Sequence, residues 1–216
     1  MPIQRAAIFD FDGTIADSFK ELAEVYDEVA IELGLRRLTA ADFDSFRNMN
    51  PLEVMRAAGV PTRKIPRLLT TMRAGMRDRT NKLRPFDGMS ETIRALDAHG
   101  CRCGILSSNS LENVQCFLQR HDLPMFDLFS CGASFLGKAS RLRKLTRRLR
   151  LPDTEIFYIG DEVRDITAAN EVGIRSIGVS WGLATREALL SVQPSHIADT
   201  PEQLITYIVN ARPSLA

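Results

Sequence analysis

The chain has 216 residues, 44% hydrophobic and 25% charged, which is enough for one well-buried domain or for a core with a smaller insertion. Its 28 lysines and arginines nearly equal its 27 aspartates and glutamates, which argues against a nucleic-acid partner because nucleic-acid-binding domains usually carry a basic excess. No apolar stretch approaches the ~20 residues that span a bilayer, and the first apolar run, AAIF, is too short for a signal peptide. We therefore expect a cytoplasmic protein with no membrane partner.

The first predicted element is a short buried strand, RAAIFDF, at residues 5–11. No strand is predicted from about Ala16 to Arg84. Instead, 3.6-residue periodicity predicts a series of helices, at residues 18–34, 39–48, 51–59 and 65–79. This helical block predicts an inserted domain, with hinges at the turn after Thr14 and in the stretch LRPFDG.

After the block, predicted helices and strands alternate to the end of the chain. The helices are expected at residues 90–100, 110–121, 138–149 and 163–173, and the strands at residues 101–106, 127–131, 155–160 and 174–179. The segment HIADTPEQLITYIV adds a last strand and helix. Alternation predicts an α/β fold, a Rossmann-like parallel sheet with helices on both faces, plus a small inserted all-α domain. The core is expected at residues 1–15 and 85–216 and the insertion at residues 16–84.

Particular residues mark the ends of these helices. Ser90, Ser110 and Thr200 are expected to be N-caps, because their hydroxyls can accept hydrogen bonds from the first free backbone N–H groups. Gly100 and Gly173 are expected to end helices.

Two carboxylates, Asp10 and Asp12, stand at the end of the first strand in FDFDGT. Alternation along a strand would point them to the same side, where their charges repel unless a proton or a cation lies between them. Ligands of open parallel sheets bind at the carboxyl ends of strands. Polar residues follow three further expected strands, namely Ser107 and Ser108 in GILSSNS, Lys138 in FLGKAS, and Asp161, Glu162 and Asp165 in YIGDEVRD.

These residue types together suit phosphoryl chemistry. The carboxylates of Asp10, Asp12 and Asp161 form an all-oxygen cluster suited to Mg²⁺. A hydroxyl, backbone N–H groups and an ammonium can bind the remaining phosphate oxygens. An ionised carboxylate can attack phosphorus, and a second acid can protonate the leaving alcohol and then deprotonate water.

The motifs DFDGTIADS and GDEVRD, with a serine after the second core strand and a downstream lysine, resemble the haloacid dehalogenase (HAD) superfamily, subfamily I, with phosphoglycolate-phosphatase-like organisation. The resemblance covers essentially the whole chain. It implies a Mg²⁺-dependent phosphatase that hydrolyses a small phosphorylated metabolite, a phosphoglycolate-like phosphomonoester, through an aspartyl-phosphate. It also implies that the helical insertion is a small mobile cap that closes over the site and shapes substrate choice.

The resemblance implies a role for each matching residue. Asp10 would be the nucleophile and Asp12 the general acid/base, while Ser107 and Lys138 would bind the phosphoryl group. The side chains of Asp10 and Asp161 and the backbone carbonyl of Asp12 would bind Mg²⁺. Further residues are expected to support the metal from behind its ligands, Asp165 and Glu162, or to bind substrate, Thr14, Ser108, Asn109 and Arg47.

The sequence departs from the family pattern at two motifs. Ala139 follows Lys138 where many relatives have proline. Many phosphatases have Thr-Asn in the second motif, where this chain has Ser107-Ser108-Asn109, and the spacing from the preceding glycine favours Ser107 over Ser108. Asp12 argues against dehalogenation, because haloalkanoate dehalogenases lack an acid at that place.

Other residues have simpler interpretations. Arg47, Asn48, Asn50 and Arg56 surround a turn of the insertion and are candidates for substrate selection. Trp181 follows a strand end, where packing is favoured over a role in positioning the cap. The basic run RLRKLTRRLR has leucines at the spacing of a core-facing stripe, which leaves its cations solvated. The histidines and cysteines lack metal-ligand spacing, and the cysteines are expected to be reduced.

Two other functions fit parts of the pattern. A sugar-phosphate mutase would share the fold but would keep its phosphorylated intermediate for return to the sugar. A receiver-type signalling module also phosphorylates an aspartate beside Mg²⁺, but the place of the nucleophile on the first strand, the second acid and the large insertion argue against it. The chain is expected to be either a monomer or a homodimer.

Overall fold

The computed structural model describes residues 4–132 and 137–211, so the outermost ends of the expected core and residues 133–136 lie outside it. Within these residues the core is a six-stranded parallel sheet in the order β5-β4-β1-β6-β7-β8. Its strands are β1 (Ala6–Phe9), β4 (Arg102–Leu106), β5 (Phe126–Ser130), β6 (Ile156–Gly160), β7 (Arg175–Val179) and β8 (His196–Ala198). The expected α/β class and the parallel sheet are therefore confirmed.

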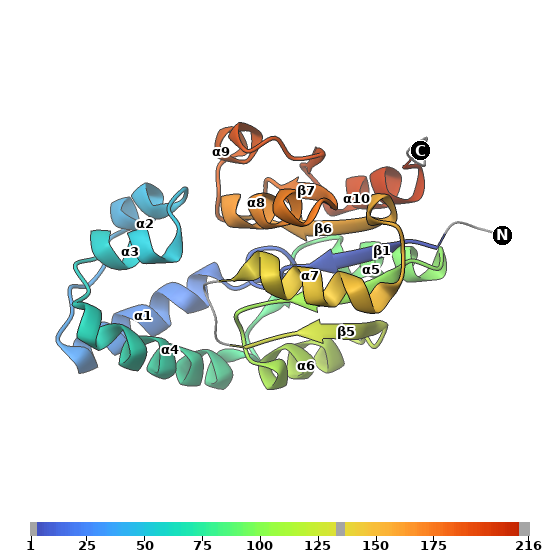
Figure 1. The fold of residues 1–216 in the computed structure, drawn as a ribbon. Helices are drawn as coiled ribbons and strands as arrows, with labels where there is room; N and C mark the ends of the chain where they lie inside the picture. Colours follow the sequence, from blue (N-terminus) through green and yellow to red (C-terminus); the bar gives the residue numbers. More distant parts are fainter. Residues whose placement is uncertain (1–3, 133–136, 212–216) are drawn as a thin grey trace.

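Helices cover both faces of the sheet (Figure 1). They are α5 (Met89–Ala98), α6 (Leu111–Arg120), α7 (Lys138–Leu149), α8 (Val163–Val172), α9 (Arg186–Ser191) and α10 (Pro201–Val209). Apolar residues of α5, α6 and α10 pack with Ala7 and Phe9, whereas those of α7 and α8 pack with Ala6 and Ile8. Successive residues of a strand face opposite sides of the sheet, and helices cover both sides. The strand β1 is therefore apolar throughout and entirely buried.

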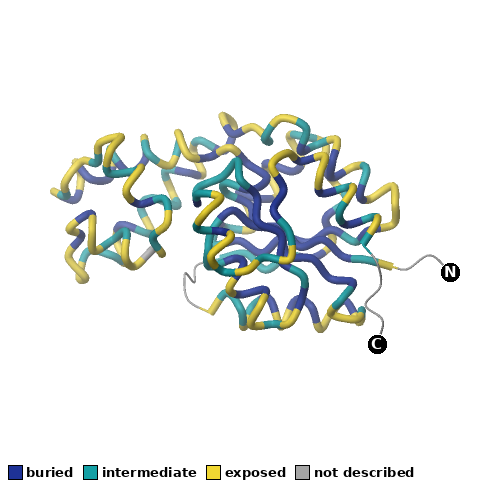
Figure 2. Tube along the Cα trace, turned by 90° about the horizontal axis from the view of Figure 1, so that it is seen from above, coloured by how far each residue is buried: buried dark blue, intermediate teal, exposed yellow. Residues whose placement is uncertain are grey.

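The helical insertion forms a separate lobe at the end of the sheet. It consists of α1 (Phe19–Leu33), α2 (Ala40–Phe46), α3 (Pro51–Ala57), a short 3₁₀ turn (Thr62–Lys64) and α4 (Ile65–Arg79). Figure 2 shows that its buried residues form a thin layer, in contrast to the thick buried centre of the core. The helices predicted for this block are confirmed.

The prediction that residues 16–84 contain no strand is wrong. The two chain segments that join the lobe to the core pair as a short antiparallel ribbon, β2 (Ala16–Asp17) with β3 (Arg84–Pro85). Two-residue strands are too short to show a periodicity of two, so the sequence gives no signal for them. The ribbon lies at the two expected hinges.

One predicted helix cap was wrong and one was only partly right, since Thr200 stands at the N-cap of α10 but its side chain makes no cap hydrogen bond. Ser90 lies inside α5, which begins after Gly88, so it is not an N-cap. The short helix α9 was not predicted. Ser110 does accept a hydrogen bond as the N-cap of α6, and Gly173 ends α8 in the left-handed conformation, at a φ of 85°. Among the described residues no helix is both long and apolar enough to cross a membrane.

Candidate active site

The expected functional residues meet at the carboxyl edge of the central strands. β1 lies between β4 and β6, and Asp10, Ser107 and Asp161 are the residues that directly follow these three strands. The backbone N–H of Asp10 donates to the carbonyl of Ile159 at 2.8 Å, so the pairing of β1 with β6 extends to the first acid. Parallel pairing thus brings distant sequence motifs to one place, the usual ligand site of such sheets.

Asp10 is buried and held from two sides. Its Oδ1 accepts from the backbone N–H of Phe11 at 2.7 Å, and its Oδ2 accepts from Nζ of Lys138 at 2.6 Å. Burial raises the pKa of Asp10 to about 6, against the charge of Lys138, which lowers it. The carboxylate is therefore mostly ionised at neutral pH, the form that can attack an electrophile.

Lys138, the first residue of α7, also forms an ion pair with Asp165. Asp165 is fully buried and accepts hydrogen bonds from the hydroxyl of Tyr158 at 3.0 Å and from the backbone N–H of Glu162 at 2.9 Å. Burial opposes the charge of Lys138, but the carboxylates of Asp10 and Asp165 raise its pKa overall, so the ammonium stays protonated. Asp165 therefore positions the lysine beside Asp10.

Asp161 is held by the loop that follows β1 and by the loop that follows β7. Its Oδ1 accepts from the hydroxyl of Thr14 at 2.8 Å, and its Oδ2 from the backbone N–H of Leu183 at 2.9 Å. Burial, together with the neighbouring acids, raises the pKa of Asp161 well above its usual value. A Cβ on Gly13 would lie 2.3 Å from Asp161 Oδ2, and one on Gly182 would lie 2.2 Å from its Cβ, so both loops require glycine here.

Three buried carboxylates converge in this site. Asp10, Asp161 and Asp165 can each offer an oxygen within 4.8 Å of the others. Burial and mutual repulsion disfavour three ionised acids unless further positive charge joins Lys138. An all-oxygen donor set is the kind that Mg²⁺ prefers, so these residues fit a bound magnesium ion. The predicted cluster of Asp10, Asp12 and Asp161 side chains is therefore wrong in one member, because Asp165 takes the place expected for Asp12.

The side chain of Asp12 lies instead against the loop that follows β4. Its Oδ2 accepts from Nδ2 of Asn109 at 3.1 Å, and the backbone N–H of Asn109 donates to Oγ of Ser107 at 3.0 Å. Burial raises the pKa of Asp12, although hydrogen bonds from Ser18 and Asn109 partly oppose this. A raised pKa suits a group that must carry a proton in part of a reaction cycle.

A cavity of about 530 Å³ opens beside these residues, between the core and the helical lobe. Asp12, Ser108, Asn109, Asp161 and Glu162 line it from the core.

Arg47 reaches this cavity from the lobe. Its Nε donates to the carbonyl of Leu183 at 2.9 Å, so it contacts the same loop that binds Asp161. Nearby, the backbone N–H of Thr185 donates to Oδ1 of Asn48 at 3.1 Å. These two residues join the lobe to the core.

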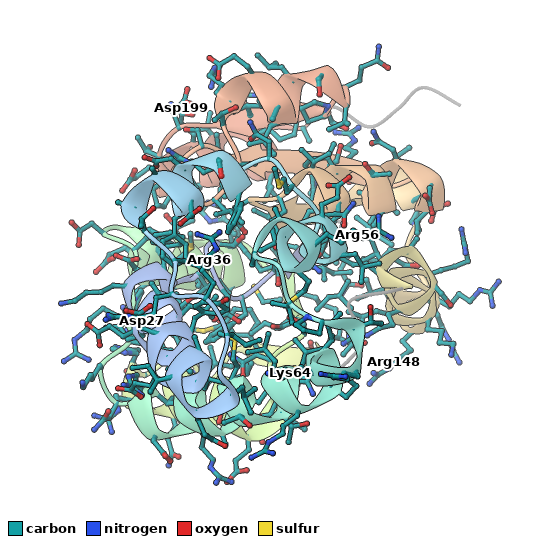
Figure 3. All side chains as sticks on the ribbon, turned by 90° about the vertical axis from the view of Figure 1, so that its left-hand side faces the viewer. Asp27, Arg36, Arg56, Lys64, Arg148 and Asp199 are labelled. Atoms are coloured by element: carbon teal, nitrogen blue, oxygen red, sulfur yellow. The ribbon has the colours of Figure 1, made fainter. Side chains whose placement is uncertain are left out.

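The other two expected lobe residues do not line this cavity. Asn50 caps α3, where it accepts from the backbone N–H groups of Leu52 and Glu53. Arg56 lies exposed on the same helix, at the lobe end of the molecule (Figure 3).

Two residues near the site were not assigned a site role from sequence. Trp181 lines the cavity, and its Nε1 donates to the carbonyl of Thr14 at 3.1 Å. Its ring lies 6.3 Å from that of Phe86, which follows β3, so it packs between the site and the ribbon of β2 and β3. Arg164 lines the same cavity and donates to Glu162 at 2.6 Å. It stands inside the GDEVRD motif, in which the expected metal-binding chemistry indicated only the acids.

Comparison with known proteins identifies the family. The model of the haloacid dehalogenase-like hydrolases matches residues 7–179, which include the acids, the serine and the lysine described above. The chain belongs to this family. A phosphoglycolate phosphatase of Synechococcus elongatus is 32% identical over 202 residues, 93% of this chain and 95% of that protein, and one of Vibrio vulnificus is 26% identical over 215 residues. The expected enzyme class, a phosphatase, is thus confirmed.

Solved structures show the same fold. A haloacid dehalogenase-like hydrolase of Streptococcus pneumoniae superposes with a TM-score of 0.83 at 22% identity, covering 96% of this chain and 99% of that one. CbbY from Rhodobacter sphaeroides, solved in complex with phosphate, superposes with a TM-score of 0.75 at 18% identity and covers 93% and 96%.

Proposed function

We propose that this protein is a Mg²⁺-dependent phosphatase that hydrolyses a small phosphorylated metabolite through an aspartyl-phosphate on Asp10. The observation that carries the proposal is the buried Asp10 carboxylate at the end of β1, 2.6 Å from the ammonium of Lys138. A second acid, Asp12, accepts a hydrogen bond from Asn109 in the loop after β4, and its raised pKa suits proton transfer.

The proposed reaction has two displacements at phosphorus. In the first, a carboxylate oxygen of Asp10 forms a bond to phosphorus while the bond to the ester oxygen breaks, and Asp12 gives its proton to the leaving alcohol. In the second, Asp12 takes a proton from water, the water oxygen attacks phosphorus, and the Asp10–phosphorus bond breaks. Inorganic phosphate leaves, and both acids return to their starting states.

Residues around Asp10 would hold the phosphoryl group. Lys138 supplies a fixed positive charge, and Ser107 and the neighbouring Ser108 and Asn109 supply hydroxyl and amide donors. The side chains of Asp10 and Asp161 and the backbone carbonyl of Asp12 would bind Mg²⁺, with Asp165 and Glu162 behind them. When bound, the ion supplies positive charge that offsets the negative charge of the site and of the phosphoryl oxygens.

Residues 16–84 would form the cap domain, and residues 1–15 with 85–216 the core domain. The ribbon of β2 and β3 would then be the connection about which the cap moves. The names of the relatives make 2-phosphoglycolate the first substrate to test. The ligand of the site would be a small molecule. Closure of the cap over the site would exclude water that could intercept the reaction.

The test is phosphate release from 2-phosphoglycolate and a panel of small phosphomonoesters. We expect activity with Mg²⁺, loss of activity with EDTA and recovery when Mg²⁺ is restored. Asp10→Asn should abolish turnover because an amide does not attack phosphorus, while Asp127→Asn, at an exposed ion pair with Arg102, should leave it unchanged. Full activity of folded Asp10→Asn would overturn the proposal. Isomerisation of a sugar phosphate without net phosphate release would favour a mutase.

A further inference from the structure

The cavity over the active site continues into the cap, and the residues that line it change from polar to mainly apolar. At the core end it is lined by acids and amides, whereas in the cap it is lined mainly by apolar side chains from all four helices, among them Leu22, Phe43, Met55, Leu69 and Met72. We propose that this cap chamber binds a hydrocarbon body on the leaving alcohol, so that the enzyme prefers amphipathic phosphomonoesters to polyol phosphates. This inference rests on the proposed function.

The arrangement of the cap helices leaves the chamber open. α1 packs along α4, and Figure 1 shows α2 and α3 set apart from that pair. The lining residues come from both pairs, so the chamber lies between them. Two of its apolar residues remain in contact with water, since Phe19 is 47% and Leu22 is 40% exposed. A ligand that covers such side chains gains the free energy of removing apolar surface from water.

Among the lining residues of the cap helices and the loops between them, those with charged groups or hydroxyls are Tyr26, Asp44, Arg47 and Arg73, and two of the four are engaged elsewhere. The guanidinium of Arg47 donates to the core loop at Leu183, and the hydroxyl of Tyr26 donates to the carbonyl of Arg36. A sugar placed in the chamber would give up hydrogen bonds to water for a mostly hydrocarbon surface, which costs free energy for each hydroxyl left without a partner. A hydrocarbon chain has no such loss.

The size of the chamber points the same way. The whole cavity, core end included, has a volume of about 530 Å³, which lies within the range of sites that bury drug-sized ligands and is far more than a two-carbon glycolate group occupies. Because the chamber is continuous with Asp12 and Asp161, a phosphate ester bound with its phosphorus beside Asp10 would direct its alcohol toward the cap. A ligand with phosphate at the core end of the cavity and hydrocarbon at the cap end would be a primary alkyl or arylalkyl phosphate.

Binding of alkylphosphonates tests the inference separately from catalysis, because their carbon–phosphorus bond is not hydrolysed. In the presence of Mg²⁺, calorimetry on the intact protein should show Kd falling by roughly 3- to 4-fold for each added methylene from methyl- to hexylphosphonate. A Kd that does not change with chain length would overturn the inference. Failure to release phosphate from any ester would overturn the proposed function, whatever the phosphonates show.

Matched variants locate the binding surface. Leu22→Gln, at a half-exposed place in the chamber, should weaken hexylphosphonate binding by roughly 5- to 10-fold and leave methylphosphonate binding unchanged. Ile31→Gln is the control, because Ile31 lies on the same helix, is 67% exposed and does not line the chamber. Equal weakening of both phosphonates by Leu22→Gln, or no weakening of either, would contradict the proposed place of binding.

Discussion

The ammonium of Lys138 lies between two buried carboxylates, and this arrangement serves both stability and chemistry. Asp10 and Asp165 would each be costly to bury alone, and one lysine partly neutralises both. Asp165 in turn accepts hydrogen bonds from Tyr158 and from the backbone N–H of Glu162, which hold it where it orients the lysine toward Asp10. The phosphate-binding role of Lys138 stays a prediction, which its place beside Asp10 supports although proline does not follow it.

We expect Lys138→Met to lower turnover by at least about 10²-fold, the cost typical of losing one preorganised charge or donor at a developing oxyanion. The variant should also melt at a lower temperature, because two buried carboxylates lose their partner. Lys144→Met is the matched control, since Lys144 lies on the same helix with its side chain exposed. Steady-state kinetics and thermal melts measure both effects.

The double variant Lys138→Met/Asp165→Asn separates the two roles. Removing one of the unpaired carboxylates should restore part of the lost stability, because the two sites are in direct contact and their effects are not additive. Turnover should remain low. If the single variant keeps its activity, Lys138 does not act on the phosphoryl group.

Helix ends around the site are stabilised by local hydrogen bonds, and the second site loop shows how. Ser110 caps α6 by accepting from the backbone N–H of Asn113 at 3.1 Å, while Oδ1 of Asn109 accepts from the side-chain amide of Asn113 at 2.9 Å. The same few residues thus begin a helix and orient Asn109 toward Asp12. The hydrogen bonds that begin α6 therefore also fix the position of Asn109 in the site.

Ser110→Ala should lower the free energy of unfolding by about 1 kcal/mol, because it removes the N-cap acceptor of α6. Ser90→Ala is the matched control, since Ser90 lies within α5 and makes no cap, and it should change stability by less than about 0.5 kcal/mol. Urea denaturation of the two variants, followed by circular dichroism, measures the difference. Equal stability of the two variants would show that this cap contributes nothing to the fold.

The two lobes of the molecule meet over the cavity, where side chains of the cap donate to and accept from one loop of the core. Arg47 of the cap donates to backbone carbonyls of the loop after β7, while the same loop donates to Asp161. The cap is also tied to the core at the ribbon of β2 and β3. Cap position and the geometry around Asp161 are therefore linked through one short loop.

Arg47→Ala should reduce kcat/KM for the best metabolite substrate about 10-fold more than for an aryl phosphate, because it removes the charged hydrogen bond that holds the cap against the core loop over the leaving group. The aryl ester depends mainly on the core residues, so its hydrolysis should change little. Arg56→Ala is the control, since Arg56 is exposed and does not line the cavity. A parallel fall for both substrates would place selectivity outside this contact.

The alternation of strands and helices along the chain, and the polar residues that end the central strands, were predictable from local patterns. Fully buried parallel strands are short apolar runs, and polar residues directly after such runs must meet at one edge because parallel strands end together. Asp10, Ser107 and Asp161 were found in this way, each as the residue after its strand. The same reasoning predicted the helical insertion, since its apolar residues repeat with the helical period.

Contacts between distant side chains were decided only when the chain folded. Arg47 and Leu183 are 136 residues apart, and neither stands in a pattern that points to the other. Whether Asp12 or Asp165 joins Asp10 and Asp161 depends on side-chain directions after the strands end, where alternation no longer applies. The two-residue ribbon and the apolar chamber between the cap helices likewise depend on how whole elements pack, because nothing within a single helix or strand specifies the space between them.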